Sequence, residues 1–211
     1  FDADYLCDMG GELSAAYLDR MPPVKGALEA TSSGLNLLRG QSIPFPVFDW
    51  NSIPLKNQIE NRFHVGNEVW PVFTDVTSMS LYRRSVLVVG YGPVGKGIAE
   101  RARALGAIVC VADLDSVRLV EAQHHGCIPV NLFEGIKRCN IVVTSTGRDG
   151  VIGEKLLRSA KPNTIFLNAG HSDREIDVDW LYRQPHHTLR PSIEEFHLDE
   201  TSILLLAKGS L

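Results

Sequence analysis

The sequence predicts an α/β protein with a doubly wound parallel sheet and a partial second domain at the N-terminus. After residue 84, short β-branched runs alternate with stretches of helical spacing, whereas the chain before it is irregular and rich in Gly and Pro. A glycine-rich loop follows the first of these runs. With 211 residues, 44% of them hydrophobic and 22% charged, the chain can bury a sizeable core, which excludes disordered and collagen-like classes.

The elements after residue 84 follow in a regular order. Residues 85–89 form a β-branched run that ends in glycines, as a buried parallel strand does. Apolar residues then recur at helical spacing over 94–105, and Asp115 can cap a second helix that stops at Gly126. A helical turn is expected over 133–136. Further strands are expected near residues 108–111, 128–130, 141–143, 164–167, 187–190 and 203–206.

The glycine loop matches the dinucleotide fingerprint G-x-G-x-x-G over Gly90-Tyr91-Gly92-Pro93-Val94-Gly95. A predicted strand precedes it, a predicted helix begins on it, and Asp113 follows Gly90 by 23 residues at the end of the next strand. The helix N-terminus can hold phosphates, and Asp113 can accept both hydroxyls of the adenosine ribose. Its carboxylate repels a 2′-phosphate. The sequence therefore predicts a Rossmann-type domain that binds NAD in preference to NADP.

Two later loops fall at the carboxyl ends of predicted strands, where open α/β sheets bind ligands. They are Thr144-Ser145-Thr146-Gly147 and Asn168-Ala169-Gly170-His171. Small hydroxyl residues and glycines suit a nicotinamide ribose or carboxamide, although ordinary turn chemistry also explains each loop taken alone.

Charge and cysteine usage exclude other classes of partner. The net charge is −4 with no Lys/Arg run, so we expect no nucleic-acid binding. The purely apolar stretches, such as residues 203–207, are far too short for a membrane span. The four cysteines form no CxxC pair and the first ten residues resemble no signal peptide, so we expect free thiols and a cytoplasmic location. The pairs His124-His125 and His186-His187 lack ligands at metal-site spacing, so we expect no metal.

Several motifs together are specific enough to indicate a family. The chain resembles the S-adenosyl-L-homocysteine hydrolase family over nearly all its length, but covers only the middle half or so of a usual member. The chain begins at Phe1 rather than Met, and we expect it to be a fragment. The resemblance is carried by the glycine loop extended through Lys96-Gly97, by Thr144 to Gly147, by Asn168 to His171 with Glu175-Ile176-Asp177-Val178-Asp179-Trp180, by Asp8-Met9-Gly10-Gly11-Glu12-Leu13, by Thr31-Ser32-Ser33-Gly34, by Lys56 with Glu60-Asn61, and by Leu205 to Gly209.

The resemblance implies that bound NAD oxidises the ribose 3′-hydroxyl of a nucleoside-type substrate, with possible elimination and hydration at 5′, in a homo-oligomer. It implies that Lys56 takes the hydroxyl proton and that Glu60 binds the hydroxyl; the nearby His64 is a further candidate. It implies cofactor contacts from Thr31, Ser32, Ser33 and Asn61 at the nicotinamide half, from Gly90, Gly92, Pro93, Val94, Gly95, Lys96 and Gly97 at the pyrophosphate, from Asp113 and Arg118 at the adenosine end, and from Thr144, Ser145, Thr146, Ala169, Gly170 and His171 around the nicotinamide.

The resemblance also implies a division of the chain. We expect a partial substrate or catalytic-domain segment over 1–65, a connecting helix or hinge over 66–83, the NAD-binding domain over 84–190, and closing strands over 191–211.

Departures from the family pattern leave alternatives open. Met9 and Ala30 stand where the family has an aspartate and a glutamate, and Glu60 replaces an aspartate. Val65 replaces a cysteine and Arg118 an asparagine. We therefore expect 3′ oxidation to be partly retained, and hydrolysis of S-adenosyl-L-homocysteine to be much slower than in a full family member. A non-catalytic NAD-binding regulator or partner-binding module is the alternative. A 2-hydroxy-acid dehydrogenase is disfavoured, because no Arg/Glu/His set accompanies the domain.

Overall fold

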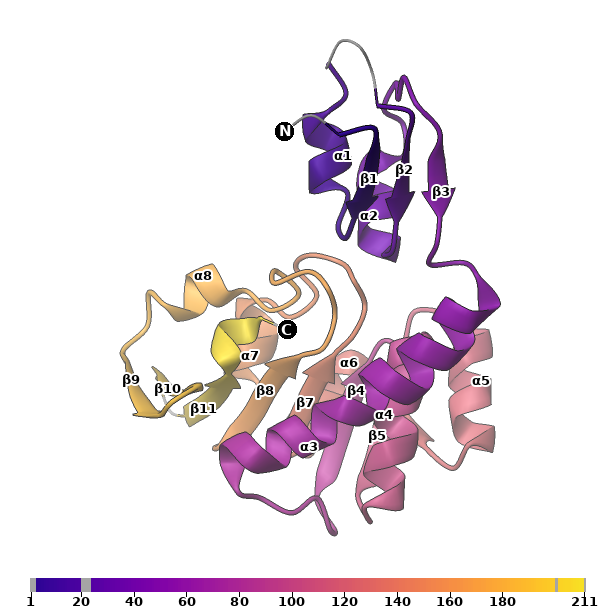
Figure 1. Ribbon diagram of the computed structural model, residues 1–211. Helices are drawn as coiled ribbons and strands as arrows, with labels where there is room; N and C mark the ends of the chain where they lie inside the picture. Colours follow the sequence, from indigo (N-terminus) through magenta and orange to yellow (C-terminus); the bar gives the residue numbers. More distant parts are fainter. Residues whose placement is uncertain (1–2, 20–23, 200, 211) are drawn as a thin grey trace. The chain divides into compact units, whose positions relative to one another are not determined.

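A computed structural model describes residues 3–19, 24–199 and 201–210 (Figure 1). The chain divides into two compact units, Phe1–Ile59 and Glu60–Leu211, which we call the N-terminal and C-terminal units. Each unit is built on its own sheet. In the parts of the chain that the structure describes, no helix has both the length and the apolar character needed to cross a membrane.

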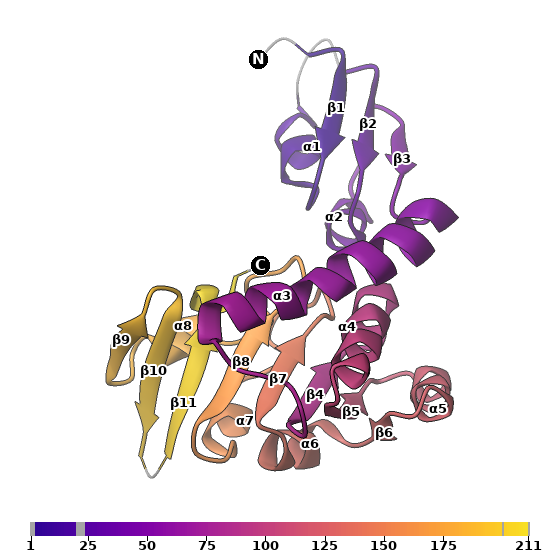
Figure 2. The same ribbon diagram turned by 60° about the horizontal axis from the view of Figure 1, so that its bottom comes forward.

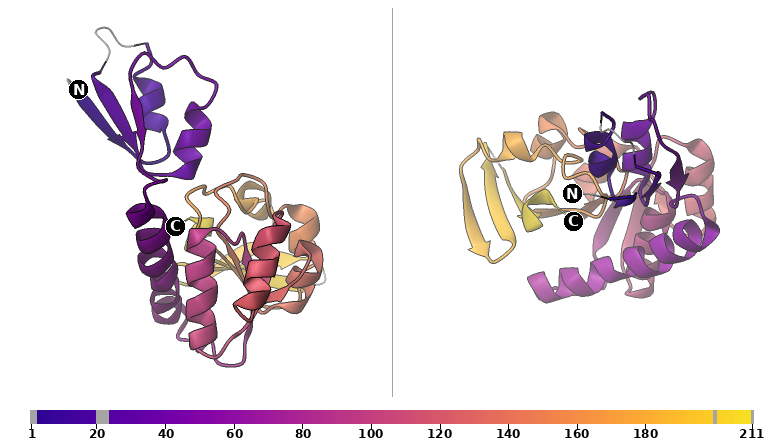
Figure 3. Two further views of the ribbon diagram at one scale, coloured as in Figure 1. Left: turned by 90° about the vertical axis from the view of Figure 1, so that its right-hand side faces the viewer. Right: turned by 45° about the horizontal axis from the view of Figure 1, so that its top comes forward.

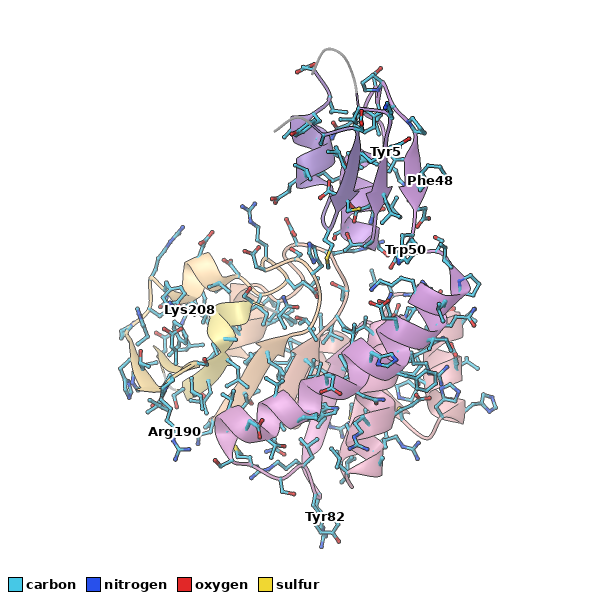
Figure 4. All side chains as sticks on the ribbon, in the orientation of Figure 1. Tyr5, Phe48, Trp50, Tyr82, Arg190 and Lys208 are labelled. Atoms are coloured by element: carbon cyan, nitrogen blue, oxygen red, sulfur yellow. The ribbon has the colours of Figure 1, made fainter. Side chains whose placement is uncertain are left out.

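The N-terminal unit holds, within its described residues, a three-stranded parallel sheet in the order β1-β2-β3. Its elements are β1 (Tyr5–Asp8), α1 (Glu12–Ala16), β2 (Gly26–Glu29), α2 (Ser32–Leu38) and β3 (Val47–Asp49). Both helices lie on one face of the sheet (Figure 3, left). Tyr5 and Phe48, on the outer strands, are exposed (Figure 4). Parallel sheets are normally covered on both faces, so this small sheet has the character of half a doubly wound domain.

The C-terminal unit is built on an eight-stranded sheet within the described residues, in the order β6-β5-β4-β7-β8-β11-β10-β9 (Figure 2). The first six of these strands are parallel, whereas β10 and β9 form antiparallel pairs at the edge. The strands are β4 (Ser85–Val89), β5 (Ile108–Ala112), β6 (Ile128–Pro129), β7 (Ile141–Thr144), β8 (Thr164–Asn168), β9 (His186–Arg190), β10 (Ile193–Leu198) and β11 (Thr201–Leu206).

Helices cover both faces of the larger sheet. The helices are η1 (Leu55–Val65), α3 (Gly66–Thr77), α4 (Pro93–Ala104), α5 (Ser116–His124), α6 (Leu132–Arg138), α7 (Glu154–Arg158), α8 (Val178–Leu181) and η2 (Ala207–Gly209). Trp70 and Ile98, from α3 and α4, enter the core on one face with Ala122 of α5. Ile136, from α6, enters the core on the other face with residues of α7 and α8. Successive residues of β4 alternate between the two cores, as strand geometry requires.

Helix α4 is held in place by a close crossing with α3. A side chain at Gly66 would collide with the backbone of α4, and a side chain at Gly97 would collide with the carbonyl of Arg62. Arg62 also donates a hydrogen bond to Glu100, at 3.0 Å from Nε, and this ion pair raises the pKa of the guanidinium. The two glycines therefore allow the helices to approach backbone to backbone.

The strands and helices predicted after residue 84 are confirmed, including the Asp115 cap, whose carboxylate accepts from the Val117 amide at 2.9 Å. Strand β10 and the three-stranded N-terminal sheet were not predicted. Free cysteines were expected, and all four are free: Cys7 is exposed, and the other three are buried.

Candidate cofactor site

The candidate site lies at the carboxyl ends of β4 and β7. Strand β4 pairs with β5 on one side and with β7 on the other, so the direction of chain winding changes at this point. Ligands of doubly wound proteins bind in the crevice outside such a switch point. The Gly90 loop follows β4, and the Ser145 loop follows β7.

Three glycines of the fingerprint have separate roles. Gly90 has φ +92°, a left-handed conformation that favours glycine, and its amide donates to Ala112 at 2.9 Å. A side chain at Gly95 would overlap the Gly90 carbonyl, so helix and loop pack in direct contact. A side chain at Gly92 would meet no protein atom within 4 Å. The space in front of Gly92 is therefore open to a ligand.

Helix α4 begins beside that open space. Pro93 is in its first turn, and the helix N-terminus has no side-chain cap among the described residues. The amides of an uncapped first turn need partners, and the helix dipole favours an anion there. This arrangement fits a pyrophosphate, because its oxygens supply both the acceptors and the negative charge.

Asp113 connects the glycine loop to the end of β5. Its Oδ2 accepts from the Tyr91 amide at 2.6 Å, and its Oδ1 accepts from the Asp115 amide at 2.9 Å. Oδ1 retains a further lone pair for a ribose hydroxyl, whereas Oδ2 also accepts from Nη1 of Arg118. The Arg118 guanidinium lies 3.5 Å from Oδ2 and is exposed. Arg118 therefore lies close to the position where a 2′-phosphate would sit.

The buried side chain of Tyr91 anchors the glycine loop. Its ring is fully buried, its hydroxyl lies 3.0 Å from Nδ1 of His125, and burial raises its pKa. Lys96 contacts the same ring by a cation–π interaction and forms a 2.6 Å ion pair with Glu121. The predicted cofactor residue Lys96 is thus engaged with protein groups. Gly97, also predicted, faces the α3 crossing.

The loop after β7 packs against the glycine loop. Ser145 donates from Oγ to the Gly90 carbonyl at 3.1 Å, and its amide donates to Val89 at 2.9 Å. Thr144 is fully buried, and its hydroxyl donates to Oδ1 of Asn168 at 3.0 Å. Ser145 therefore supports the Gly90 loop, and Thr144 supports the next loop along the sheet.

Asn168 organises the loop after β8. Its Oδ1 accepts from the Gly170 amide at 2.8 Å, and its Nδ2 donates to carbonyls of Gly170, Ser172 and Gly209. The predicted residues Ala169 and Gly170 are buried in this loop, and His171 is exposed. The sequence motif contained Asn168, but its structural role was not predicted.

Glu175 joins the loops after β7 and β8, and sequence reasoning missed it as a site residue. Its carboxylate is fully buried and accepts from the Thr146 hydroxyl at 2.7 Å and from the Thr146 and Gly147 amides. A side chain at Gly170 would overlap its Oε1. Burial raises the pKa of Glu175, and these hydrogen bonds oppose the rise. The sequence signal that could have indicated Glu175 is its position in the E-I-D run 175–177, which follows the N-A-G-H loop 168–171.

A second buried glutamate organises the N-terminal unit. Oε1 of Glu29 accepts from the Thr31 hydroxyl at 2.6 Å and from the Thr31 and Gly10 amides at 2.7 and 3.1 Å. The Thr31 hydroxyl in turn accepts from the Gly34 amide at 3.0 Å, which caps α2. Asn51 donates to Oγ of Ser32 at 2.8 Å, and Ser33 donates to the Thr31 hydroxyl. The predicted segment 31–33 is therefore held as one rigid turn.

The family departures fall at the carboxyl ends of β1 and β2. Met9 follows Asp8 and is 64% exposed, and Ala30 follows Glu29. Asp8 itself is buried, and its Oδ2 accepts from the Ser14 amide at 2.6 Å. The exposed Met9 and the partly buried Ala30 thus follow two buried carboxylates, Asp8 and Glu29.

The predicted catalytic residues lie in η1, which has π-helical geometry over eleven residues and runs directly into α3. Lys56 and Asn61 are partly buried, and Glu60 and His64 are exposed. π-Helical segments are rare and occur frequently at functional sites. The boundary between the two units falls inside η1, after Ile59.

Comparison with known proteins agrees with this geometry. Residues 70–211 match the sequence profile described as "S-adenosyl-L-homocysteine hydrolase, NAD binding domain". The chain is 33% identical to an adenosylhomocysteinase of Archaeoglobus fulgidus over 99% of its length. It is also 33% identical to an S-inosyl-L-homocysteine hydrolase of Methanothermobacter thermautotrophicus, over 88% of its length. It covers 52% and 46% of these two relatives, so it spans about half their length.

Two solved structures share the fold at low sequence identity. A dipicolinate synthase chain from Bacillus halodurans matches with a TM-score of 0.61 at 16% identity, covering 75% of this chain and 55% of that one. A D-lactate dehydrogenase from Aquifex aeolicus, solved with NAD and lactic acid, matches with a TM-score of 0.59 at 17% identity, covering 86% of this chain and 60% of that one. At these identities the likeness concerns the fold alone, and it confirms the predicted α/β class with a parallel sheet.

Proposed function

The chain belongs to the S-adenosyl-L-homocysteine hydrolase family and its cofactor is NAD, and we propose that it uses NAD to oxidise the ribose 3′-hydroxyl of a nucleoside substrate. The observation that carries the proposal is the alignment of the chain with an adenosylhomocysteinase over 99% of its length, which includes the Thr31 turn and the Lys56 segment as well as the nucleotide domain. A chain that only bound NAD would need the C-terminal unit alone.

In this proposal the C-terminal unit holds the cofactor. The α4 N-terminus and the Gly92 backbone bind the pyrophosphate, and Asp113 binds the adenosine ribose. Glu175 and Asn168 fix the two loops that enclose the nicotinamide end. Arg118 lowers the discrimination against a 2′-phosphate without removing it, because the Asp113 charge remains.

The chemistry of this proposal needs the bound cofactor and two side chains of the protein. When bound, NAD⁺ accepts a hydride from the ribose C3′. Lys56 accepts the proton of the 3′-hydroxyl, and Glu60 binds the same hydroxyl and orients the ribose.

Elimination and hydration at 5′ are weakened in the same proposal. Met9 cannot transfer a proton, and Ala30 cannot accept a hydrogen bond from the substrate through its side chain. Loss of a general acid–base group typically lowers the rate by 10²–10⁴. We therefore expect nucleoside-dependent reduction of NAD with little release of homocysteine from S-adenosyl-L-homocysteine.

The cofactor part is tested by calorimetry with NAD and NADP. Asp113→Ala should weaken NAD by about 1–3 kcal/mol, because a charged hydrogen-bond acceptor is lost. Asp75→Ala, an exposed carboxylate on α3, is the matched control and should bind NAD normally. Equal affinity for NAD and NADP in the unmodified protein would contradict the assigned role of Asp113.

The catalytic part is tested by the absorbance of reduced nicotinamide after addition of adenosine, inosine or their homocysteine thioethers. Lys56→Ala should abolish the signal and leave NAD affinity unchanged. Lys25→Ala is the control, since Lys25 pairs with Asp4 at 3.0 Å on the surface of the same unit. Reduction that persists in Lys56→Ala would refute the role of this lysine.

A second candidate function is a non-catalytic NAD-binding module. The absence of carboxylates at the exposed Met9 and the partly buried Ala30 favours it. In that case NAD binds and Asp113→Ala weakens binding, but no nucleoside reduces the cofactor in the protein with Lys56 intact.

A further inference from the structure

The edge of the large sheet carries a cluster of metal-binding side chains that plays no part in the NAD site. Strands β9 and β10 run antiparallel at this edge (Figure 2). Their register places His187 directly opposite Glu195. His197 lies two residues beyond Glu195, so strand alternation places both side chains on one face. The register therefore brings two imidazoles and one carboxylate together.

The three side chains offer ligand atoms within 4.8 Å of one another. Nε2 of His187 lies 3.5 Å from Oε2 of Glu195, and the rings of His187 and His197 stack at 5.5 Å and 15°. Both histidines are exposed, and Glu195 is partly buried. Small side-chain rotations close such a group around an ion without moving either strand.

The adjacent histidine shows that this grouping depends on the face of the sheet. His186 precedes His187 but points to the opposite face, where it stacks on Phe196 at 5.1 Å and contacts Tyr182. Its ring belongs to the packing of that face. The two neighbouring histidines therefore have different roles.

We propose that His187, Glu195 and His197 form a binding site for one divalent transition-metal ion of the zinc class. Two imidazole nitrogens and a carboxylate oxygen suit Zn²⁺, Co²⁺ and Ni²⁺, whereas Mg²⁺ and Ca²⁺ select oxygen ligands. The exposure of the two histidines leaves the remaining coordination positions open to water. Glu195 supplies the negative charge that a cation site on this edge needs.

The ion would fasten the outermost strand to the sheet. All five residues of β9 are exposed, and its pairing with β10 contains a register shift at Ile193/Glu194. An exposed edge strand with a bulge is held by few contacts, so a cross-strand ion adds stability to it. Ile193 pairs with Leu206 at the carboxyl end of β11, while His197 pairs with Ser202 near its start. The site therefore lies away from the cofactor edge.

The sequence pattern predicted no metal site at the His186-His187 pair, because no ligand stands near it in the sequence. Glu195 and His197 follow His187 by 8 and 10 residues, across the turn between β9 and β10. Only the antiparallel register brings them within reach.

The test is titration of the metal-stripped full chain with Zn²⁺ at neutral pH, followed by calorimetry and by thermal unfolding. We expect one ion per chain and a rise in the unfolding temperature. His187→Ala and His197→Ala should each weaken binding at least about tenfold. His124→Ala on α5 is the matched control, and NAD affinity should be unchanged by Zn²⁺.

Co²⁺ provides a second readout that does not depend on a variant folding. Cys7 is an exposed thiol and could itself bind Zn²⁺. Nitrogen and oxygen coordination gives a Co²⁺ spectrum without thiolate charge-transfer absorption, and Cys7→Ser should leave it unaltered. Absence of a bound ion, thiolate absorption, or equal affinity in His187→Gln and His197→Gln would overturn the proposal.

Discussion

Glu29 in the N-terminal unit and Glu175 in the C-terminal unit are both fully buried, and both accept backbone amides from loops at the carboxyl ends of strands. Each carboxylate also lies against a glycine, Gly34 or Gly170, at which a side chain would overlap it. In each unit, a buried carboxylate thus holds loops at the carboxyl ends of strands.

The difference lies in how each carboxylate is satisfied. Both oxygens of Glu175 accept hydrogen bonds, from Thr146 and Gly147. Glu29 receives its three bonds at Oε1, and its Oε2 has no hydrogen-bond partner among the described residues. A fully satisfied buried carboxylate fixes its loops, whereas a half-satisfied one leaves an acceptor that costs free energy. We infer that the loops around Glu175 are held more firmly.

The largest expected effect comes from Glu175→Gln. Its new amide group must face donors that now bond to a carboxylate oxygen, so buried N–H groups lose their acceptor. We expect a loss of about 3 kcal/mol in unfolding free energy and faster hydrogen exchange at the Thr146 and Gly147 amides. Unchanged exchange at these amides would mean that Glu175 does not hold the loop.

The pH dependence of the stability of Glu175→Gln tests the direction of the pKa shift of Glu175. Burial raises the pKa of Glu175 in the folded state above its ordinary value. The carboxyl group therefore contributes stability below the unfolded pKa, and this contribution is lost as the pH rises through the folded pKa. Gln does not titrate, so the deficit of Glu175→Gln relative to the unmodified protein should shrink as the pH rises from about 4. A deficit that grows over that interval would contradict the direction of the shift.

A smaller effect is expected from placing a methyl group against each carboxylate. Gly170→Ala displaces an oxygen that already accepts hydrogen bonds, and we expect a cost of about 2–3 kcal/mol. Gly34→Ala presses on the Glu29 carboxylate, including its partnerless oxygen, and should cost about 1–2 kcal/mol. Gly153→Ala, where a side chain would meet nothing within 4 Å, is the control. Denaturant unfolding measures all three, and a larger loss in Gly34→Ala than in Gly170→Ala would reverse the inferred order.

The sequence predicted the elements of the C-terminal unit because each has a regular signal. β-Branched runs, helical spacing and a glycine fingerprint are local patterns. Each strand or helix that they predicted after residue 84 was confirmed. Strand β10 escaped because its residues 194, 195 and 197 are charged or polar and break the apolar run. The strands of the N-terminal unit escaped because they are only three or four residues long, between Gly and Pro.

No local pattern of this kind marks Glu175 or Glu29 as a residue that holds loops. Glu175 lies 29 residues from Thr146, and the pattern of either segment gives no indication that they meet. Glu29 was not predicted as a site residue, because only its neighbour Ala30 was compared with the family pattern. Buried carboxylates of this kind depend on the tertiary path of loops, which local periodicity does not describe.

The smallest effect should come from Glu29→Gln, and it sharpens the comparison most directly. The Gln Oε1 can keep all three hydrogen bonds from Thr31 and Gly10, while Nε2 replaces an oxygen that has no partner among the described residues. We expect a change within about 1 kcal/mol and unaltered hydrogen exchange at the Thr31 amide. Glu29→Ala removes the acceptor itself, so that variant should expose the Thr31 amide to exchange. If Glu29→Gln is as damaging as Glu175→Gln, the negative charge rather than the hydrogen-bond count holds the turn that carries Ser32 and Ser33.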